Sequence, residues 1–416
     1  MTAGMEAGAR AAGSAEPSGD AATSGGDRAG RPVWRARAVR WVALALYGIV
    51  LFLAADCVYS SFFNRLEEWP RGPHPAYHHG LVANFDGYDL WGEAHYRFRT
   101  NSLGFRDGQV REVPLVPTTR RILLIGDSFT EGTGLAFEDT LAGLLQAAGM
   151  RQADKVEFLN AGVLSYSPTL YYRKVKHLLE RGLRFDELVV LSDVSDVYDE
   201  ATHYFCQDDA PQYQAYCEPG ERAFFDSVCR TRAGGRKEPC DVIPYRYSTD
   251  NWGAWLARHF FVTNGVRMHV KFELQRWNGS MKQRRLALET ASAWLFSPNE
   301  LEADYAPLGS AQGMARSVKS MQALADLLKQ HGIPLTIVVY PWPVELARDD
   351  RASRQVSLWR PFCATNCKAF IDASPAFFAE AQAHADWYER LFIKGDDHYS
   401  AEGNRVLFEA IKQHLL

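Results

Sequence analysis

The stretch RILLIGDSFTEGTG, residues 121–134, passes from a short apolar run directly into a glycine, an acid and a hydroxyl. An apolar run that ends at Gly, Asp and Ser predicts a buried strand followed by a tight turn. Ser128 in this turn has two interpretations. Serine often caps the helix that follows such a turn, and a serine presented at the end of a strand is also a candidate nucleophile. Features elsewhere in the chain decide between them.

Short apolar segments alternate with amphipathic segments after this turn. Nearly unbroken apolar runs, typical of parallel strands covered on both faces, predict strands at 121–125, 156–159, 187–191, 335–340 and 369–372. Helices are predicted between and after them, at 137–148, 168–181, 311–331, 374–384 and 400–415. This alternation predicts an α/β fold, a three-layer doubly wound parallel sheet, over residues 119–416.

The alternation is lost between residues 200 and 310, and we interpret this region as an insertion carried by the sheet domain. Six cysteines lie in the insertion and in the later CATNC motif: Cys206, Cys217, Cys229, Cys240, Cys363 and Cys367. No zinc-ligand spacing surrounds them, so we expect disulfides rather than a metal site, with the connectivity left open. The tryptophans of the insertion either pack inside it or stack on sugars; they are Trp252, Trp255, Trp277 and Trp294.

The N-terminal region predicts a membrane anchor. Residues 1–40 are mostly Ala, Gly, Ser and Arg, and we expect a disordered cytoplasmic tail. The uncharged run that follows predicts a transmembrane helix over 41–59. Arginines before the helix stay in the cytoplasm, which places the remaining chain in the periplasm, with the helix as a single pass through the inner membrane. A cleaved signal peptide is the alternative. Segment 60–118, with the polar loop HPAYHH, is interpreted as a linker.

Composition excludes one class of partner. The chain has 416 residues, of which 47% are hydrophobic and 23% charged, as in ordinary globular proteins. Its formal net charge of -4 gives no basis for nucleic-acid binding. We therefore expect no nucleic-acid partner.

A nucleophilic serine needs a base and an acid that orients the base. Near the C-terminus, Asp396 and His398 share one loop before the last predicted helix. A carboxylate and an imidazole so placed can hydrogen-bond to each other, which leaves the second ring nitrogen for a hydroxyl. The turn after the second strand offers the backbone N–H of Gly162. Carboxyl ends of parallel strands meet at one edge of the sheet, so these groups can converge on Ser128.

These residues resemble the sequence blocks of the SGNH, or GDSL-like, hydrolases. The likeness covers roughly residues 97–200 and 310–416. The resemblance implies that Ser128 attacks an ester, His398 acts as base and then acid, and Asp396 orients it. It also implies that the N–H groups of Ser128 and Gly162 hold the oxyanion. Two positions depart from the family pattern: Ser195 stands where an asparagine donor is usual, and Asp396 is one residue closer to the histidine than is common.

The anchored topology, the lead-in NSLGFRD at 101–107 and the stretch VVYPWP at 338–343 resemble proteins linked to envelope polysaccharide O-acetylation. This implies O-acetyl transfer to or from a cell-envelope glycan through an acyl-Ser128 intermediate, with a membrane-bound acyltransferase as partner. The alternatives are an esterase acting on a small or lipid ester and a non-catalytic accessory subunit. No cofactor and no metal are expected.

Overall fold

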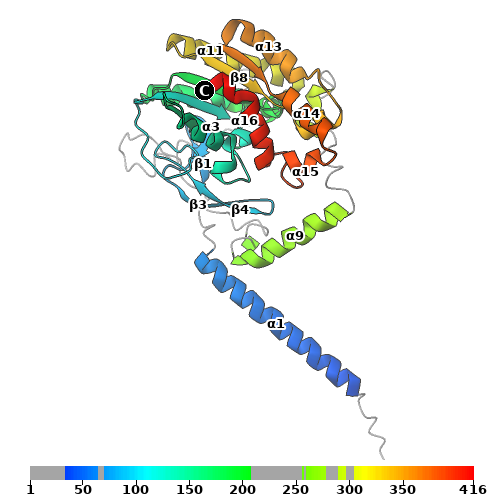
Figure 1. Ribbon diagram of the computed structural model, residues 1–416. Coiled ribbons are helices and arrows are strands. Elements are labelled where there is room, and N and C mark those ends of the chain that lie inside the picture. Colours follow the sequence, from blue (N-terminus) through cyan, green and yellow to red (C-terminus); the bar gives the residue numbers. More distant parts are fainter. Residues whose placement is uncertain (1–32, 64–69, 208–254, 257–258, 278–288, 297–303) are drawn as a thin grey trace, which may run out of the picture. The chain divides into compact units, whose positions relative to one another are not determined.

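The computed structural model describes residues 33–63, 70–207, 255–256, 259–277, 289–296 and 304–416 (Figure 1). The chain divides into two compact units, Met1–Ala54 and Ala55–Leu416. The second unit contains every strand found in the described residues, and the candidate site.

The N-terminal helix is longer than the sequence predicts. Helix α1 runs over Val33–Phe63, and its stretch Arg37–Phe62 is long and apolar enough to cross a membrane, a property that signal sequences share. The predicted boundary of the tail at residue 40 is therefore wrong, because residues 33–40 are already helical. Alanine and arginine favour helix, and no breaker follows Pro32. The predicted disorder of residues 1–32 lies outside the described part of the chain.

The central sheet has the predicted α/β architecture. Its five strands are all parallel and follow the order β6-β5-β7-β8-β9, with bounds Arg120–Gly126 (β5), Val156–Asn160 (β6), Glu187–Ser192 (β7), Leu335–Val339 (β8) and Ala369–Asp372 (β9). All five strands lie where the apolar runs predict them. After β6 the chain crosses back over β5 to build the other half of the sheet, and such a switch point is where ligands bind in open α/β sheets.

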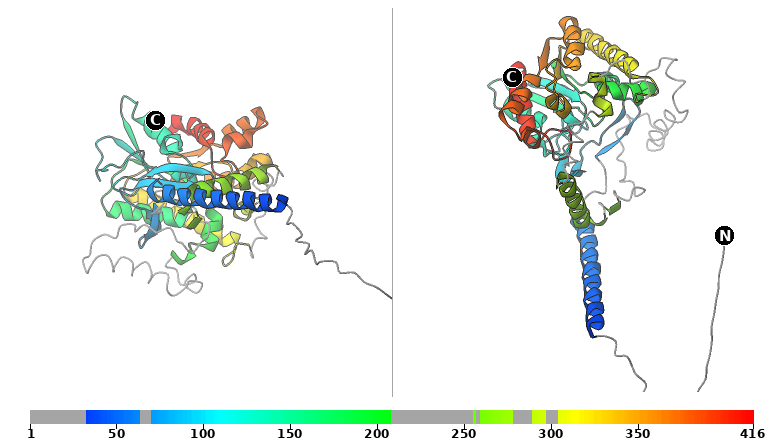
Figure 2. Two further views of the ribbon diagram at one scale, coloured as in Figure 1. Left: turned by 90° about the horizontal axis from the view of Figure 1, so that it is seen from below. Right: turned by 90° about the vertical axis from the view of Figure 1, so that its right-hand side faces the viewer.

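Helices cover both faces of the sheet. Successive residues of β5 point to opposite sides: Ile122 and Leu124 enter one core cluster, and Leu123 and Ile125 enter the other, all fully buried. In Figure 2 the red α16 and the green α4 lie on opposite sides of the sheet. The first face packs against α3 (Leu141–Gly149), α14 (Ser374–Ala383) and α16 (Ala401–Leu415), and the second against α4 (Pro168–Glu180), α11 (Ser310–Gln330) and α13 (Arg354–Asn366).

Several short helices were not predicted, because one or two turns are too short to show an apolar period. They are α2 (Ser128–Glu131), α5 (Asp196–Thr202), η2 (Phe205–Gln207), α12 (Pro343–Ala347) and α15 (Trp387–Leu391). The helix predicted at 137–148 is divided between η1 (Phe137–Asp139) and α3. Among the described residues of the predicted insertion lie α9 (Phe261–Trp277) and η3 (Thr290–Leu295).

Segment 60–118 is not a linker, and that prediction is wrong. It forms two antiparallel hairpins, β1 (Arg71–His74) with β2 (His78–Leu81) and β3 (Asp86–Trp91) with β4 (Ala94–Arg99). Phe98 and Phe105 are fully buried in the second core cluster, and His74 of the predicted polar loop is buried too. The alternating pattern of β3 and β4, with a two-residue Gly92-Glu93 turn and a positive φ at Gly92, is a hairpin signal that was available in the sequence.

Of the six cysteines expected to form disulfides, the three that the structure describes are disulfide-bonded. Cys363 and Cys367 form a disulfide, and Cys206 is also disulfide-bonded. Cys217, Cys229 and Cys240 lie outside the described residues. The insertion tryptophans differ from one another: Trp294 is buried and donates to the Val194 carbonyl, whereas Trp277 is exposed.

Candidate active site

The turn after β5 is shaped by close packing. A Cβ at Gly126 would lie 2.0 Å from Thr130 Oγ1 and 2.7 Å from the Leu191 carbonyl oxygen, so only glycine fits there. The carboxylate of Asp127 accepts a hydrogen bond from the Phe129 N–H and caps α2. The cap of this helix is therefore Asp127, and Ser128 is the first helical residue, with its hydroxyl oxygen 3.2 Å from Asp127 Oδ2.

The Ser128 hydroxyl meets the loop that precedes α16. Its Oγ lies 2.7 Å from His398 Nε2, although the two residues are 270 positions apart in the chain. His398 Nδ1 contacts Asp396 Oδ1 in a short hydrogen bond, and the His398 N–H donates to the same oxygen over 3.0 Å. With Nδ1 donating to the carboxylate, Nε2 accepts from the serine hydroxyl. The structure thus brings all three predicted catalytic residues into one hydrogen-bonded chain.

The electrostatics suit a base at His398. Burial by itself would lower the pKa of the imidazole, but the Asp396 carboxylate outweighs it and raises the pKa above the usual 6.5. Asp127, the other acid near Ser128, has its pKa raised well above the ordinary value by burial and by the neighbouring Asp193 and Asp196. A raised pKa favours the neutral form of Asp127, and this form opposes negative charge on the substrate oxygen less than a carboxylate would.

Trp91, which the sequence did not single out, belongs to this constellation. Its indole Nε1 donates to Asp396 Oδ2 over 3.0 Å, and its ring meets the His398 ring edge to face at 5.2 Å. Phe129 stacks on the other side of His398 at 4.8 Å. The β3–β4 hairpin therefore fixes both the acid and the base, because one aromatic residue at its tip contacts the two.

The oxyanion donors are only partly as predicted. The Gly162 N–H donates to Asn160 Oδ1 over 3.0 Å, and the Ser195 hydroxyl donates to Asp193 Oδ2 over 2.7 Å. Each of these groups has one proton, so in this conformation neither is directed at an oxyanion. The Ser128 N–H stands at the first position of α2, where a helix leaves its N–H groups without an intrahelical acceptor. Of the three predicted donors, Ser128 is the one that the geometry keeps available.

Gly162 also allows the loop after β6 to pack closely on α2. A Cβ there would lie 2.7 Å from Thr130 Cβ and 3.0 Å from the Glu131 nitrogen. The loop after β6 therefore packs directly on α2, and the absence of a side chain permits this approach. The sequence identified a residue that packs on α2, and its role as an oxyanion donor stays a prediction.

The lead-in NSLGFRD also supports α2. The guanidinium of Arg106, which is almost fully buried, donates to the backbone carbonyls of Glu131, Gly132 and Leu135. These carbonyls lie at and just after the C-terminus of α2, where a cation also interacts favourably with the helix dipole. Arg106 thus holds the helix that carries Ser128.

The stretch VVYPWP contacts residues next to Ser128 and His398. The Tyr340 hydroxyl contacts Asp127 Oδ1 at 3.4 Å, and the Trp342 indole donates to Asp193 Oδ1 over 2.8 Å. The neighbouring Pro341 carbonyl accepts a hydrogen bond from the Tyr399 hydroxyl, which joins this stretch to the His398 loop. Both sequence motifs noted outside the catalytic blocks therefore contact elements of the site.

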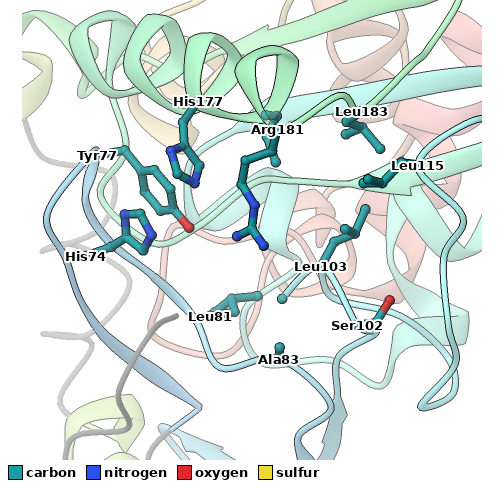
Figure 3. Close-up of a pocket in the computed structure, with 12 residues that line it drawn as sticks. His74, Tyr77, Leu81, Ala83, Ser102, Leu103, Leu115, His177, Arg181 and Leu183 are labelled. Carbon is teal, nitrogen blue, oxygen red and sulfur yellow. The ribbon is translucent and has the colours of Figure 1, made fainter. Parts of the chain in front are cut away.

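A separate cavity of about 380 Å³ lies away from these residues (Figure 3). It is lined on one side by His74, Tyr77, His177 and Arg181 and on the other by leucines. None of its lining residues belongs to the Ser128–His398–Asp396 chain. Within the described residues no group of three or more His, Cys, Asp or Glu side chains is arranged to hold a metal ion.

Comparison with known proteins gives structural likenesses only. No family model and no curated protein matches the chain. Among solved structures, LAE5, an alpha/beta hydrolase enzyme from the metagenome of Lake Arreo, Spain, is 12% identical, with 72% of this chain and 96% of that one covered and a TM-score of 0.36.

Two other solved structures are similar to the same extent. A member of the lipolytic protein G-D-S-L family from Veillonella parvula is 9% identical (71% and 98% covered, TM-score 0.34). A catalytic mutant of Axe2, an acetylxylan esterase from Geobacillus stearothermophilus, is 12% identical (73% and 97% covered, TM-score 0.33). At such identities the function of this chain has to be argued from its own site.

Proposed function

We propose that the protein is a serine-dependent enzyme of acyl-ester chemistry, with Ser128 as nucleophile. The observation that carries the proposal is the hydrogen-bonded chain from Ser128 Oγ through His398 to Asp396. A serine becomes nucleophilic when a neighbouring base takes its proton and an acid stabilises the imidazolium that results. The nucleophile, the base and the acid are all present, and His398 lies within hydrogen-bonding distance of both Ser128 and Asp396.

The reaction proceeds in two steps. Ser128 Oγ attacks the acyl carbonyl carbon while His398 Nε2 takes the hydroxyl proton, and the Ser128 N–H donates to the carbonyl oxygen as it gains charge. The ester bond breaks, His398 returns the proton to the departing alcohol, and an acyl-Ser128 remains. A second hydroxyl, from water or from an acceptor, then attacks the acyl group with His398 again as base, and the serine is released.

The substrate and location that we propose are more specific. We infer O-acetyl transfer to or from a cell-envelope polysaccharide in the periplasm, by a chain anchored in the inner membrane through α1 and partnered with a membrane-bound acyltransferase. Support comes from the length and apolarity of Arg37–Phe62 and from the two motifs that resemble O-acetylation proteins, both of which contact the site. An esterase on a small or lipid ester is the alternative within the same chemistry, and a non-catalytic accessory subunit is the alternative outside it.

A pair of serine variants tests the catalytic proposal. Ser128→Ala in the full chain removes the nucleophile, and we expect hydrolysis of an activated acetyl ester to fall by at least about 1,000-fold. Ser357→Ala is the matched control, because that serine is exposed on α13. Equal rates in Ser128→Ala and the control would refute the proposal and favour the accessory subunit.

The acceptor is tested separately. The full chain is incubated with an activated acetyl ester and purified envelope glycans, and both free acetate and glycan-bound acetate are measured. We expect acetylated glycan that disappears with Ser128→Ala. Release of acetate without acetylated glycan would contradict the proposed transferase reaction and favour the esterase alternative.

A further inference from the structure

Helix α9 carries an apolar stripe that the described part of the protein leaves uncovered. Its members recur every three or four residues and are 39% to 87% exposed; they are Val262, Val266, Val270, Leu274 and Trp277. At about 100° per residue they fall within an arc of roughly 120° on the helix surface, which they share with Thr263 and Glu273. Scattered apolar residues are ordinary on protein surfaces, but five that gather on one helix face indicate a binding surface.

Other side chains of α9 attach the helix to the catalytic unit. Asn264, on the side of the helix away from the stripe, is buried. Glu273 forms an ion pair of 2.6 Å with Lys394, and His269 lies 3.4 Å from Glu93 in the turn of the β3–β4 hairpin. These contacts fix the rotation of α9 about its axis, so the stripe cannot turn inward to bury itself.

The N-terminus of α9 contacts Asp56 of α1. Asp56, the first charged residue after the uncharged run 41–55, is buried and accepts from the N–H groups of Val262 and Thr263 over 2.9 and 2.7 Å. The Ser60 hydroxyl accepts from the Phe261 N–H. A carboxylate at a helix N-terminus satisfies the unpaired N–H groups and complements the helix dipole. If 41–55 lies in a bilayer, Asp56 and the start of α9 lie at its surface.

We propose that α9 docks on the lipid surface, with the stripe among the headgroups and upper acyl chains. Interfacial helices have this combination of an apolar face and basic residues beside it, and Arg267 and Lys271 are exposed on one border of the stripe. Lys394, which pairs with Glu273 of α9, is two residues from Asp396. The docked helix therefore holds the catalytic loop next to the membrane, where an acyl donor or acceptor carried by lipid would arrive. The inference rests on the membrane anchoring in the proposed function.

Photo-crosslinking of the full chain tests this docking. The photoreactive residue p-benzoylphenylalanine replaces Val266 or Val270 in the stripe, and the protein is reconstituted into vesicles of phosphatidylethanolamine and phosphatidylglycerol. Leu46 in α1 serves as the control for membrane insertion. Val116, an exposed apolar residue of the catalytic unit before β5, serves as the matched control for a water-facing surface. Lipid adducts are detected by mass spectrometry.

We expect lipid adducts at positions 46, 266 and 270 and none at 116. Adducts at 46 alone, or crosslinks from 266 and 270 to protein instead of lipid, would overturn the docking of α9. The absence of an adduct at 46 would show that α1 does not enter the bilayer and would overturn the inference with it. Ester hydrolysis by the same proteins is measured alongside, so that failure of the docking is distinguished from failure of the catalytic proposal.

Discussion

Replacing Trp91 by phenylalanine removes one hydrogen bond to the catalytic acid and little else. Phenylalanine keeps an aromatic ring beside His398 but loses the indole N–H that Asp396 Oδ2 accepts over 3.0 Å. Asp396 retains the imidazole and the His398 N–H as donors on its other oxygen. The variant therefore tests whether the hairpin contributes to catalysis through Asp396.

The expected magnitude follows from the environment of that bond. A hydrogen bond to a charged group contributes about 1.5–3 kcal/mol. The Asp396 side chain is 18% exposed, so water can partly replace the lost donor, and we take the lower end of the range. About 1.5 kcal/mol corresponds to roughly a tenfold decrease in kcat/KM. The decrease should be mainly in kcat, because Asp396 acts on the imidazolium that forms in the transition state.

The assay is steady-state hydrolysis of an activated acetyl ester by the full chain, with Tyr88→Phe as control. Tyr88 lies on the same hairpin, and its ring stacks on His95 instead of contacting the triad. Trp91→Phe is also measured in an Asp396→Asn background, where its effect should shrink, since residues that act through one another are not additive. A kcat/KM within twofold of wild type, or an unchanged effect in the Asp396→Asn background, would refute the reasoning.

Two further predictions concern the base and the packing of α2. Asp396 raises the pKa of His398 above 6.5, and the imidazole acts as a base only when it is neutral. We therefore expect kcat/KM to fall as the pH decreases, with a limb above pH 6.5 that Asp396→Asn moves to lower pH. A pH–rate profile with no such limb would contradict His398 as base. Gly162→Ala should destabilise the fold by about 1–3 kcal/mol and lower kcat/KM, because the added Cβ overlaps Thr130. Gly265→Ala, in open space on α9, is its control in thermal unfolding, and equal Tm values for the two variants would contradict the packing argument.

Much of the fold can be predicted because its signals are local. Parallel strands covered on both faces consist of continuous apolar residues, so β5 to β9 are visible as runs in the chain. The β3–β4 hairpin was missed although its alternation and its Gly92 turn are also local signals.

The candidate site divides in the same way. Asp396 and His398 are two residues apart, so the sequence alone could pair them, and the Gly-Asp-Ser turn alone could present Ser128. The contact of Trp91 with Asp396 joins residues 305 positions apart, and no pattern in either segment specifies it. The partners of Gly162 and Ser195 are Asn160 and Asp193, each two positions away along the chain, so these hydrogen bonds are local although the sequence patterns did not identify them.

The sequence by itself determined the class of fold, the nucleophile turn and the acid–base pair, since each depends on neighbours along the chain. Only the tertiary structure decided that the N-terminal hairpins belong to the catalytic unit and that Trp91 contacts Asp396. The physical reason is that apolar periodicity records which side chains are buried, whereas a hydrogen bond depends on distance and direction between groups that folding alone brings together.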